Sequence, residues 1–226
     1  RLAAARGRAG AGGGAGRESG LRGGRVRYRE HRACIAAHDS LTRMICQANH
    51  VRRKCHGLDL DPGALAECRI HAPAVHLTHG DALSLPYQDA SFDITYCHFL
   101  LLWVKDPSQA LREMKRVTRS SGSILAFAEP DYTNRMDKPD ELAALGKWQM
   151  DALKRQGADP SFGARLAESF YEAGIQLIET GPIQGQELMR DAEEREQEWA
   201  VIESDLAGFV PAQEIQRMKV LDLQAW

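Results

Sequence analysis

Acidic side chains follow two neighbouring apolar segments of this sequence, at the points where each segment ends. Asp59 and Asp61 close the segment CHGLDLD, and Asp81 lies in the triplet GDA at the end of AVHLTHGDA. A carboxylate can accept both hydroxyl protons of a ribose diol, and a second carboxylate can accept from an adenine amino group. The two acids Asp59 and Asp81 therefore predict an adenosine site, whereas Asp61 is equally suited to cap the helix that begins at Pro62.

The elements that must position these acids alternate between strands and helices. Apolar segments at 55–61, 74–82, 91–104 and 123–130 predict strands, and the segment 91–104 is nearly continuously apolar, as in a strand covered on both faces. Helical patterns separate the first strand from the second and the third from the fourth. This alternation predicts a parallel α/β sheet with helices on both faces, in which ligands bind at the carboxyl ends of the strands.

The clearest helix of the sequence is DPSQALREMKRVTRSSG. Asp106 is expected at its N-cap with Pro107 in the first turn, and Gly122 is expected to end it. Its apolar stripe consists of Ala110, Leu111, Met114 and Val117. After residue 132, segments 138–156, 163–174 and 191–208 have further amphipathic helical patterns, and 175–183 predicts a strand.

Composition indicates one soluble domain. The chain has 226 residues, of which 27% are charged and 43% hydrophobic. The longest apolar run, Phe99–Val104, is far too short to cross a bilayer, and no secretory leader is apparent. Five dispersed cysteines without a C-x-x-C pair indicate reduced thiols. We therefore expect a cytoplasmic protein with no membrane partner and no bound metal.

Charge is distributed unevenly along the chain. Residues 1–54 carry twelve Arg and one Lys against three acids, a net charge of +10, and the remaining residues carry −12. Residues 1–24 hold nine Gly and six Ala without an apolar period. We expect 1–54 to be an atypical, disordered Arg/Gly-rich segment, 55–132 to be the core, and 133–226 to form a helical lid and the rest of the same domain.

The core resembles a class I S-adenosylmethionine (SAM)-dependent methyltransferase, in the small-molecule branch with a type 11 methyltransferase domain. The run from Gly80 to Asp93, GDALSLPYQDASFD, carries the resemblance most specifically. The pattern W-x-x-D-P, L-x-E-x-x-R-V and a glycine at Gly122 supports it. The resemblance implies a Rossmann-like sheet, SAM as cofactor and methyl transfer to a small-molecule substrate.

The resemblance also implies roles for individual residues. Asp59 would bind the SAM ribose, with Leu60 against the adenine. Asp81 would accept from the adenine amino group beside Ala82, and His98 would lie beside the methionine moiety. Such enzymes act largely by positioning the methyl group, so the catalytic residue stays unknown. If a base exists, the candidates at strand ends are His98, Asp131 and Tyr132, each of which is also suited to packing or capping.

One departure from the family is plain. The glycine loop that should precede Asp59 by about 20 residues falls in the window REHRACIAAHDSLTRM, which contains no glycine. The earlier stretch AGAGGGAG has no apparent strand before it, and we do not interpret it as the SAM loop. Two explanations stay open: residues 1–54 are the product of a reading-frame error, or they are a genuine basic arm. The first strand with its loop and the last antiparallel strand are both expected to be missing, the latter through a truncated C-terminus that leaves an open sheet edge.

Three rival functions compete with a methyltransferase. A short-chain NAD-dependent dehydrogenase needs a Tyr-x-x-x-Lys pair, and none of the five tyrosines has Lys four residues on. An RNA-binding protein would use the basic arm, but Tyr28 is its only aromatic residue, so a nucleic-acid partner is not expected. A catalytically inactive methyltransferase-like protein is the third alternative. The acceptor, the atom methylated and the oligomeric state are open.

Overall fold

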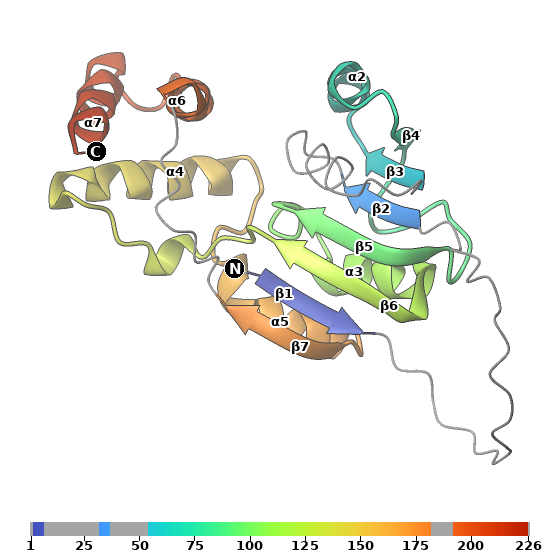
Figure 1. The fold of residues 1–226 in the computed structure, drawn as a ribbon. Helices are drawn as coiled ribbons and strands as arrows, with labels where there is room; N and C mark the ends of the chain where they lie inside the picture. The colour runs from blue at the N-terminus through green and yellow to red at the C-terminus, as the bar shows by residue number, and fades with distance from the viewer. Residues whose placement is uncertain (1, 7–31, 37–53, 182–191, 226) are drawn as a thin grey trace, which may run out of the picture.

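The strands of this protein form one seven-stranded sheet in the order β4-β3-β2-β5-β6-β1-β7. The computed structural model describes residues 2–6, 32–36, 54–181 and 192–225 (Figure 1). The strands are β1 Leu2–Arg6, β2 Arg32–Ala36, β3 Lys54–Asp59, β4 His76–His79, β5 Phe92–His98, β6 Thr118–Phe127 and β7 Gln176–Gly181. The helices are α2 Pro62–His71, α3 Pro107–Val117, α4 Ala143–Arg155, α5 Phe162–Glu172, α6 Ala192–Leu206 and α7 Ala212–Gln224, with single 3-10 turns η1 Tyr132–Asn134 and η2 Asp140–Leu142.

Five neighbouring strands run parallel. β4, β3, β2, β5 and β6 pair in parallel, while β1 pairs antiparallel with both β6 and β7. Figure 1 shows the arrowheads of β2, β3, β5 and β6 pointing to the same side of the sheet. The strand–helix–strand alternation therefore folds into the α/β Rossmann-like sheet that the sequence predicts.

Two expectations about the sheet are corrected. The first strand is not missing, because β2 lies between β3 and β5 in the middle of the sheet. The antiparallel strand near the other edge is not missing either, because β1 occupies that place between β6 and β7. The sequence did not reveal these strands because neither has the long apolar pattern of a buried strand. Residues 1–54 are thus not uniformly without structure, and the rest of that segment lies outside the described residues.

The two faces of the sheet are covered by different helices. Along β6, Ile124 and Ala126 pack in the cluster that contains the buried side chains of α3 and α5. The alternate residues Leu125 and Phe127 pack in the cluster around Cys68 of α2. Successive side chains of a strand point to opposite faces, so apolar side chains on both sides of β6 require cover on both sides.

Helix α3 begins as its sequence predicts. Asp106 is the N-cap and accepts from the Gln109 N–H at 2.8 Å, Pro107 opens the helix, and the whole predicted apolar stripe is buried. The expected end at Gly122 is wrong: the helix stops at Val117 and β6 starts at once. Thr118 is extended, and its Oγ1 lies 2.8 Å from that of Thr95 in β5, so sheet pairing overrides the helical pattern.

Helices α4, α6 and α7 form a separate helical layer. Their shared cluster includes Leu145, Trp199, Leu206, Ile215 and Met218. Figure 1 shows this layer beyond the carboxyl ends of β5 and β6. The remaining elements after residue 133, α5 and β7, belong to the sheet, and a role for the layer as a lid stays a prediction.

Candidate functional site

Asp59 is the last residue of β3, at the carboxyl edge of the sheet. One carboxylate oxygen, Oδ1, accepts from the backbone N–H of Asp61 at 2.8 Å. Within the described residues, no hydrogen bond reaches the other oxygen, Oδ2. Asp61 caps α2 by accepting from the Gly63 N–H at 2.8 Å. The structure thus separates the two acids: Asp61 has a capping role, and Asp59 keeps an acceptor for a ligand.

Asp81 lies on the same edge, two residues beyond the end of β4. β3 and β4 pair in parallel with Asp59 opposite His79, so the two strands carry their acids to neighbouring positions. The Asp81 Oδ1 accepts from the Leu83 N–H at 2.8 Å. Its second oxygen also has no partner in the part of the chain that the structure describes. Two carboxylates, each with an oxygen that none of the described residues contacts, are thereby held on adjacent strand ends.

The space around Gly80 explains why the GDA triplet begins with a glycine. Its N–H donates to the Asp59 carbonyl at 3.0 Å, and a Cβ on this residue would come within 3.0 Å of the Leu58 side chain. A larger residue would require the buried Leu58 side chain to shift. Ala82, next to Asp81, is half-buried.

Leu60 projects outward at the edge between the acids. Its side chain is 65% exposed. The Leu60 carbonyl oxygen lies 3.0 Å from the His79 Nε2 at the end of β4. An exposed apolar side chain beside two acceptors can pack against a flat ring, so Leu60 suits an adenine neighbour.

His98 ends β5, on the far side of β2 from Asp59. Since neighbouring strands are about 4.8 Å apart, the two strand ends are separated by about 10 Å. His98 is half-buried, and the backbone changes direction immediately after it. Phe99 has φ 51° and its N–H donates to the Phe127 carbonyl at 3.1 Å. A bulky residue in the left-handed region is strained, which is typical of functional edges.

Glu129 holds the backbone that follows His98, and sequence reasoning missed it. This fully buried residue follows β6, where Ala128 also has a positive φ of 52°. Its Oε1 accepts from the N–H groups of Leu100 and Leu101 at 3.0 and 3.1 Å. Its Oε2 accepts from Leu101 and Leu102 at 3.1 and 3.3 Å. The signal in the sequence is an acid at the end of an apolar segment, as for Asp59.

Burial of Glu129 raises the pKa of its carboxyl group above the usual value, and the hydrogen bonds from the three backbone N–H groups lower it in part. The Cys97 Sγ–H donates to the Glu129 Oε1 at 3.9 Å. Burial is the main cause that raises the pKa of this thiol well above its usual value, and the nearby Glu129 raises it further. The Cys97 thiol is therefore protonated and is not a nucleophile at neutral pH.

The two other base candidates have different surroundings. Asp131 is the N-cap of η1 and accepts from the Thr133 N–H and Oγ1 and from the Asn134 side chain. This favours the capping interpretation of Asp131. Tyr132 is half-buried, and burial raises the pKa of its phenol, so it is protonated at neutral pH.

Two features of the sequence analysis lie outside the described residues. One is the glycine stretch AGAGGGAG, and the other is the segment after β2, where the family's glycine loop would stand. Among the residues that the structure does describe, no group of three or more His, Cys, Asp or Glu side chains is placed to hold a metal ion. None of the described helices combines the length and the apolar character needed to cross a membrane.

Comparison with known proteins finds a methyltransferase domain within this chain. Residues 39–126 match the family model of the methyltransferase domain, beginning just beyond β2. This match and the methyltransferase relatives support a class I SAM-dependent methyltransferase. The family's fold thus agrees with the parallel sheet, and the matched residues include Asp59, Asp81 and His98.

Two curated relatives illustrate the sequence similarity. A demethylmenaquinone methyltransferase of Staphylococcus haemolyticus is 42% identical over 138 residues, covering 54% of this chain and 58% of the relative. An uncharacterised 37.1 kDa protein in transposon TN4556 of Streptomyces fradiae is 34% identical over 152 residues, covering 64% of this chain and 42% of that protein. The chain therefore spans about half the length of the curated relatives it matches.

Solved structures share the fold at lower identity. A methyltransferase-like protein of Haloferax volcanii, solved in complex with the methyltransferase activator Trm112, has a TM-score of 0.57 at 17% identity, covering 70% of this chain and 67% of its own. A methyltransferase-like protein of Bacillus halodurans C-125 has a TM-score of 0.53 at 18% identity, covering 68% of this chain and 66% of its own. These similarities extend to the fold alone.

Proposed function

We propose that this chain binds SAM at the carboxyl edge of β3, β4 and β5 and transfers its methyl group to a small-molecule acceptor. The observation that carries the proposal is the pair Asp59 and Asp81, on the ends of adjacent parallel strands, each with one carboxylate oxygen unused within the described residues. These two acceptors fit the donors of an adenosine, namely the ribose hydroxyls and the adenine amino group.

Each residue of the edge has a binding or positioning role in this proposal. Asp59 would accept from the ribose hydroxyls, and Asp81 from the adenine amino group, with Leu60 packed on the ring and Ala82 leaving room beside it. His98 would line the methionine end. When bound, SAM supplies a methyl group on a positively charged sulfur, and loss of that methyl leaves S-adenosylhomocysteine.

The protein's contribution to rate is then the placement of the acceptor. Glu129 fixes the backbone from Leu100 to Leu102, which forms the edge next to His98. The layer of α4, α6 and α7 lies beyond the carboxyl ends of β5 and β6 and, as a lid, would exclude water from the site. Holding an acceptor in line with the methyl group accelerates transfer without a base, which agrees with the capped Asp131 and the protonated Tyr132.

The class of acceptor is proposed only as a small molecule. The names of the relatives point to different acceptors, demethylmenaquinone in one group and a malonyl group on acyl-carrier protein in another. Since the chain covers only part of each relative, these names favour a small organic acceptor without selecting one.

Calorimetric titration with S-adenosylhomocysteine tests the proposal. The wild type is expected to bind with a dissociation constant in the micromolar range, about −8 kcal/mol. Asp59→Asn should weaken binding by at least about tenfold, because a charge-assisted hydrogen bond is lost. Asp61→Asn is the matched control: it makes the same charge change two residues away, keeps a good N-cap, and should bind normally. A wild type that does not bind would favour the inactive methyltransferase-like alternative.

A further inference from the structure

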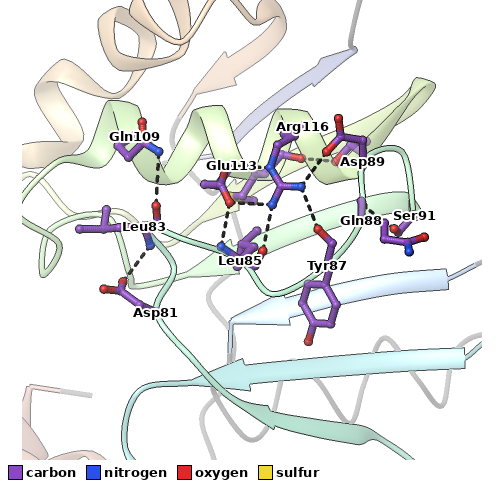
Figure 2. Close-up of polar contacts among 12 residues, drawn as sticks. Asp81, Leu83, Leu85, Tyr87, Gln88, Asp89, Ser91, Gln109, Glu113 and Arg116 are labelled. Carbon is purple, nitrogen blue, oxygen red and sulfur yellow. Dashed lines mark hydrogen bonds and ion pairs between the residues drawn. The ribbon is translucent and has the colours of Figure 1, made fainter.

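The loop between β4 and β5 forms hydrogen bonds with one face of α3 along most of its length (Figure 2). The Glu113 Oε2 accepts from the Leu85 N–H at 2.8 Å, and the Gln109 Nε2 donates to the Leu83 carbonyl at 3.3 Å. At the far end of the loop, the Ala90 N–H donates to the backbone carbonyl of Arg116 at 2.9 Å. Asp81 stands at the start of this same loop.

Arg116 uses its whole guanidinium group in the contact. Its Nη1 donates to the Tyr87 carbonyl and to the Asp89 Oδ1, both at 2.8 Å. Its Nη2 donates to the Leu85 carbonyl at 2.9 Å and to the Glu113 Oε2 at 2.7 Å, and its Nε donates to the Glu113 Oε1 at 2.8 Å. These contacts engage every one of the five N–H donors that an arginine side chain has.

Glu113 sets the position of that guanidinium group. It lies one helical turn before Arg116 and binds it with both oxygens, in the bidentate geometry that fixes an arginine in one orientation. The Glu113 side chain is only 14% exposed and that of Arg116 is 32% exposed. Asp89 is 78% exposed, so its ion pair with Arg116 contributes little. Glu113 and the carbonyls of Leu85 and Tyr87 are therefore the main partners of Arg116.

The hydrogen bonds from α3 hold the residues that follow Asp81. Gln109 and Glu113 hold Leu83 and Leu85, and the Leu83 N–H is the group that orients the Asp81 carboxylate, at 2.8 Å. The Ser84 N–H also donates to the Asp81 carbonyl at 3.1 Å. The residues that follow Asp81 are thus held by α3, whose apolar face is buried.

We infer that Glu113 and Arg116 are positioning residues for SAM binding, because they hold the loop that presents Asp81 to the adenine. This inference rests on the proposed function and deepens it, since it assigns a role to the E-x-x-R pair of α3. A loop that is ordered before the ligand arrives loses little conformational entropy on binding. Lysine cannot replace Arg116, because an ammonium has three donors and no planar fork.

Variants of adjacent residues on α3 separate this role from a general effect of charge. Arg116→Gln removes one positive charge and the fork, and should weaken S-adenosylhomocysteine binding about tenfold, as for one lost charge-assisted hydrogen bond. Lys115→Gln removes the same charge from the same helix, but Lys115 donates instead to the carbonyls of Ala173 and Gly174. This control should bind normally. Arg116→Lys should behave like Arg116→Gln.

A double-mutant cycle with Asp81→Asn shows whether Arg116 acts through Asp81. In the Asp81→Asn background, Arg116→Gln should weaken binding by less than about twofold, because the contact it supports is already lost. Equal weakening in both backgrounds, or no weakening in either, would overturn the inference. If Asp81→Asn itself binds normally, both the inference and the adenine site are wrong.

Hydrogen exchange of the unliganded protein keeps the inference testable even if the wild type does not bind. The amides of Leu83 and Leu85 should exchange about tenfold faster in Arg116→Gln than in Lys115→Gln, with α2 unchanged in both. Unchanged exchange of these two amides would overturn the inference independently of the cofactor. Faster exchange throughout the core would also overturn it, since Arg116 would then support the fold rather than the loop.

Discussion

Both carboxyl oxygens of Glu129 accept from the backbone N–H of Leu101, each at 3.1 Å. The two residues follow neighbouring strands, β6 and β5, at the edge where the ligand site is proposed. The flanking residues Phe99 and Ala128 have positive φ angles. One buried carboxyl group therefore stabilises two strained turns that shape this edge.

Glu129→Gln should destabilise the protein by about 2–3 kcal/mol. The amide keeps one acceptor but turns an NH₂ group toward backbone N–H groups, which leaves at least one of them buried without a partner. Urea unfolding measures the change, with Glu168→Gln as the control, because Glu168 is exposed on α5 and its loss should cost less than about 0.5 kcal/mol. Equal stability of the two variants would show that the Glu129 hydrogen bonds are dispensable.

The stability of the wild type should also depend on pH through Glu129. Its pKa in the folded state is raised above the ordinary value of 4.5, so in the window above pH 4.5 the folded protein retains a proton that the unfolded chain has lost. The stabilisation is full below that window and declines as the pH rises through the raised pKa. Unfolding curves measured at increasing pH above 4.5 should show the difference between wild type and Glu129→Gln becoming smaller. A difference that grows with pH contradicts this assignment.

Gly163→Ala should destabilise the fold by about 2–3 kcal/mol, as overpacking does. Its added Cβ would stand 2.5 Å from the Glu129 carbonyl oxygen and 2.6 Å from that of Pro130. Gly181→Ala is the control, because a Cβ there meets nothing within 4 Å. Thermal unfolding of both variants checks the prediction, and a stable Gly163→Ala would mean that α5 does not pack closely on this turn.

Asp61→Ala should lower the free energy of unfolding by about 1 kcal/mol through loss of the α2 cap. Binding of S-adenosylhomocysteine should change little, because the structure assigns Asp61 to the Gly63 N–H rather than to a ligand. Measuring both properties on one preparation distinguishes the two acids. A variant with normal stability and weakened binding would move Asp61 into the site.

Much of the fold followed from local patterns, because they report burial directly. The segment around Leu58 predicts β3, Asp106 and Pro107 predict the start of α3, and the stripe from Ala110 to Val117 predicts its buried face. Local patterns predicted wrong boundaries where contacts between residues far apart in the sequence determine the structure. Residues 99–104 read as a continuation of β5, but the strand stops at His98. The buried carboxyl group of Glu129, 28 residues beyond Leu101, binds that backbone instead.

The sequence predicts the acids of the site but not the residues that hold them in place. Asp59 and Asp81 follow apolar segments, so the sequence alone locates them at strand ends. The E-x-x-R pair on α3 is visible as spacing, but its contact with a loop about 28 residues earlier depends on tertiary structure. β1 was missed for a similar reason, since its pairing partners β6 and β7 are far along the chain.

The most direct measurement compares two ligands that differ only in the purine, where the 6-amino group and unprotonated N1 of adenine become a carbonyl and an N1–H group in hypoxanthine. The wild type should bind S-adenosylhomocysteine at least about tenfold more tightly than S-inosylhomocysteine, because Asp81 accepts from an amino group but not from a carbonyl. Asp81→Asn should abolish or reverse this preference, since its amide can donate to the carbonyl, whereas Asp89→Asn in the same loop should keep it. Equal affinity of the wild type for both ligands would contradict an adenosine site at the ends of β3 and β4.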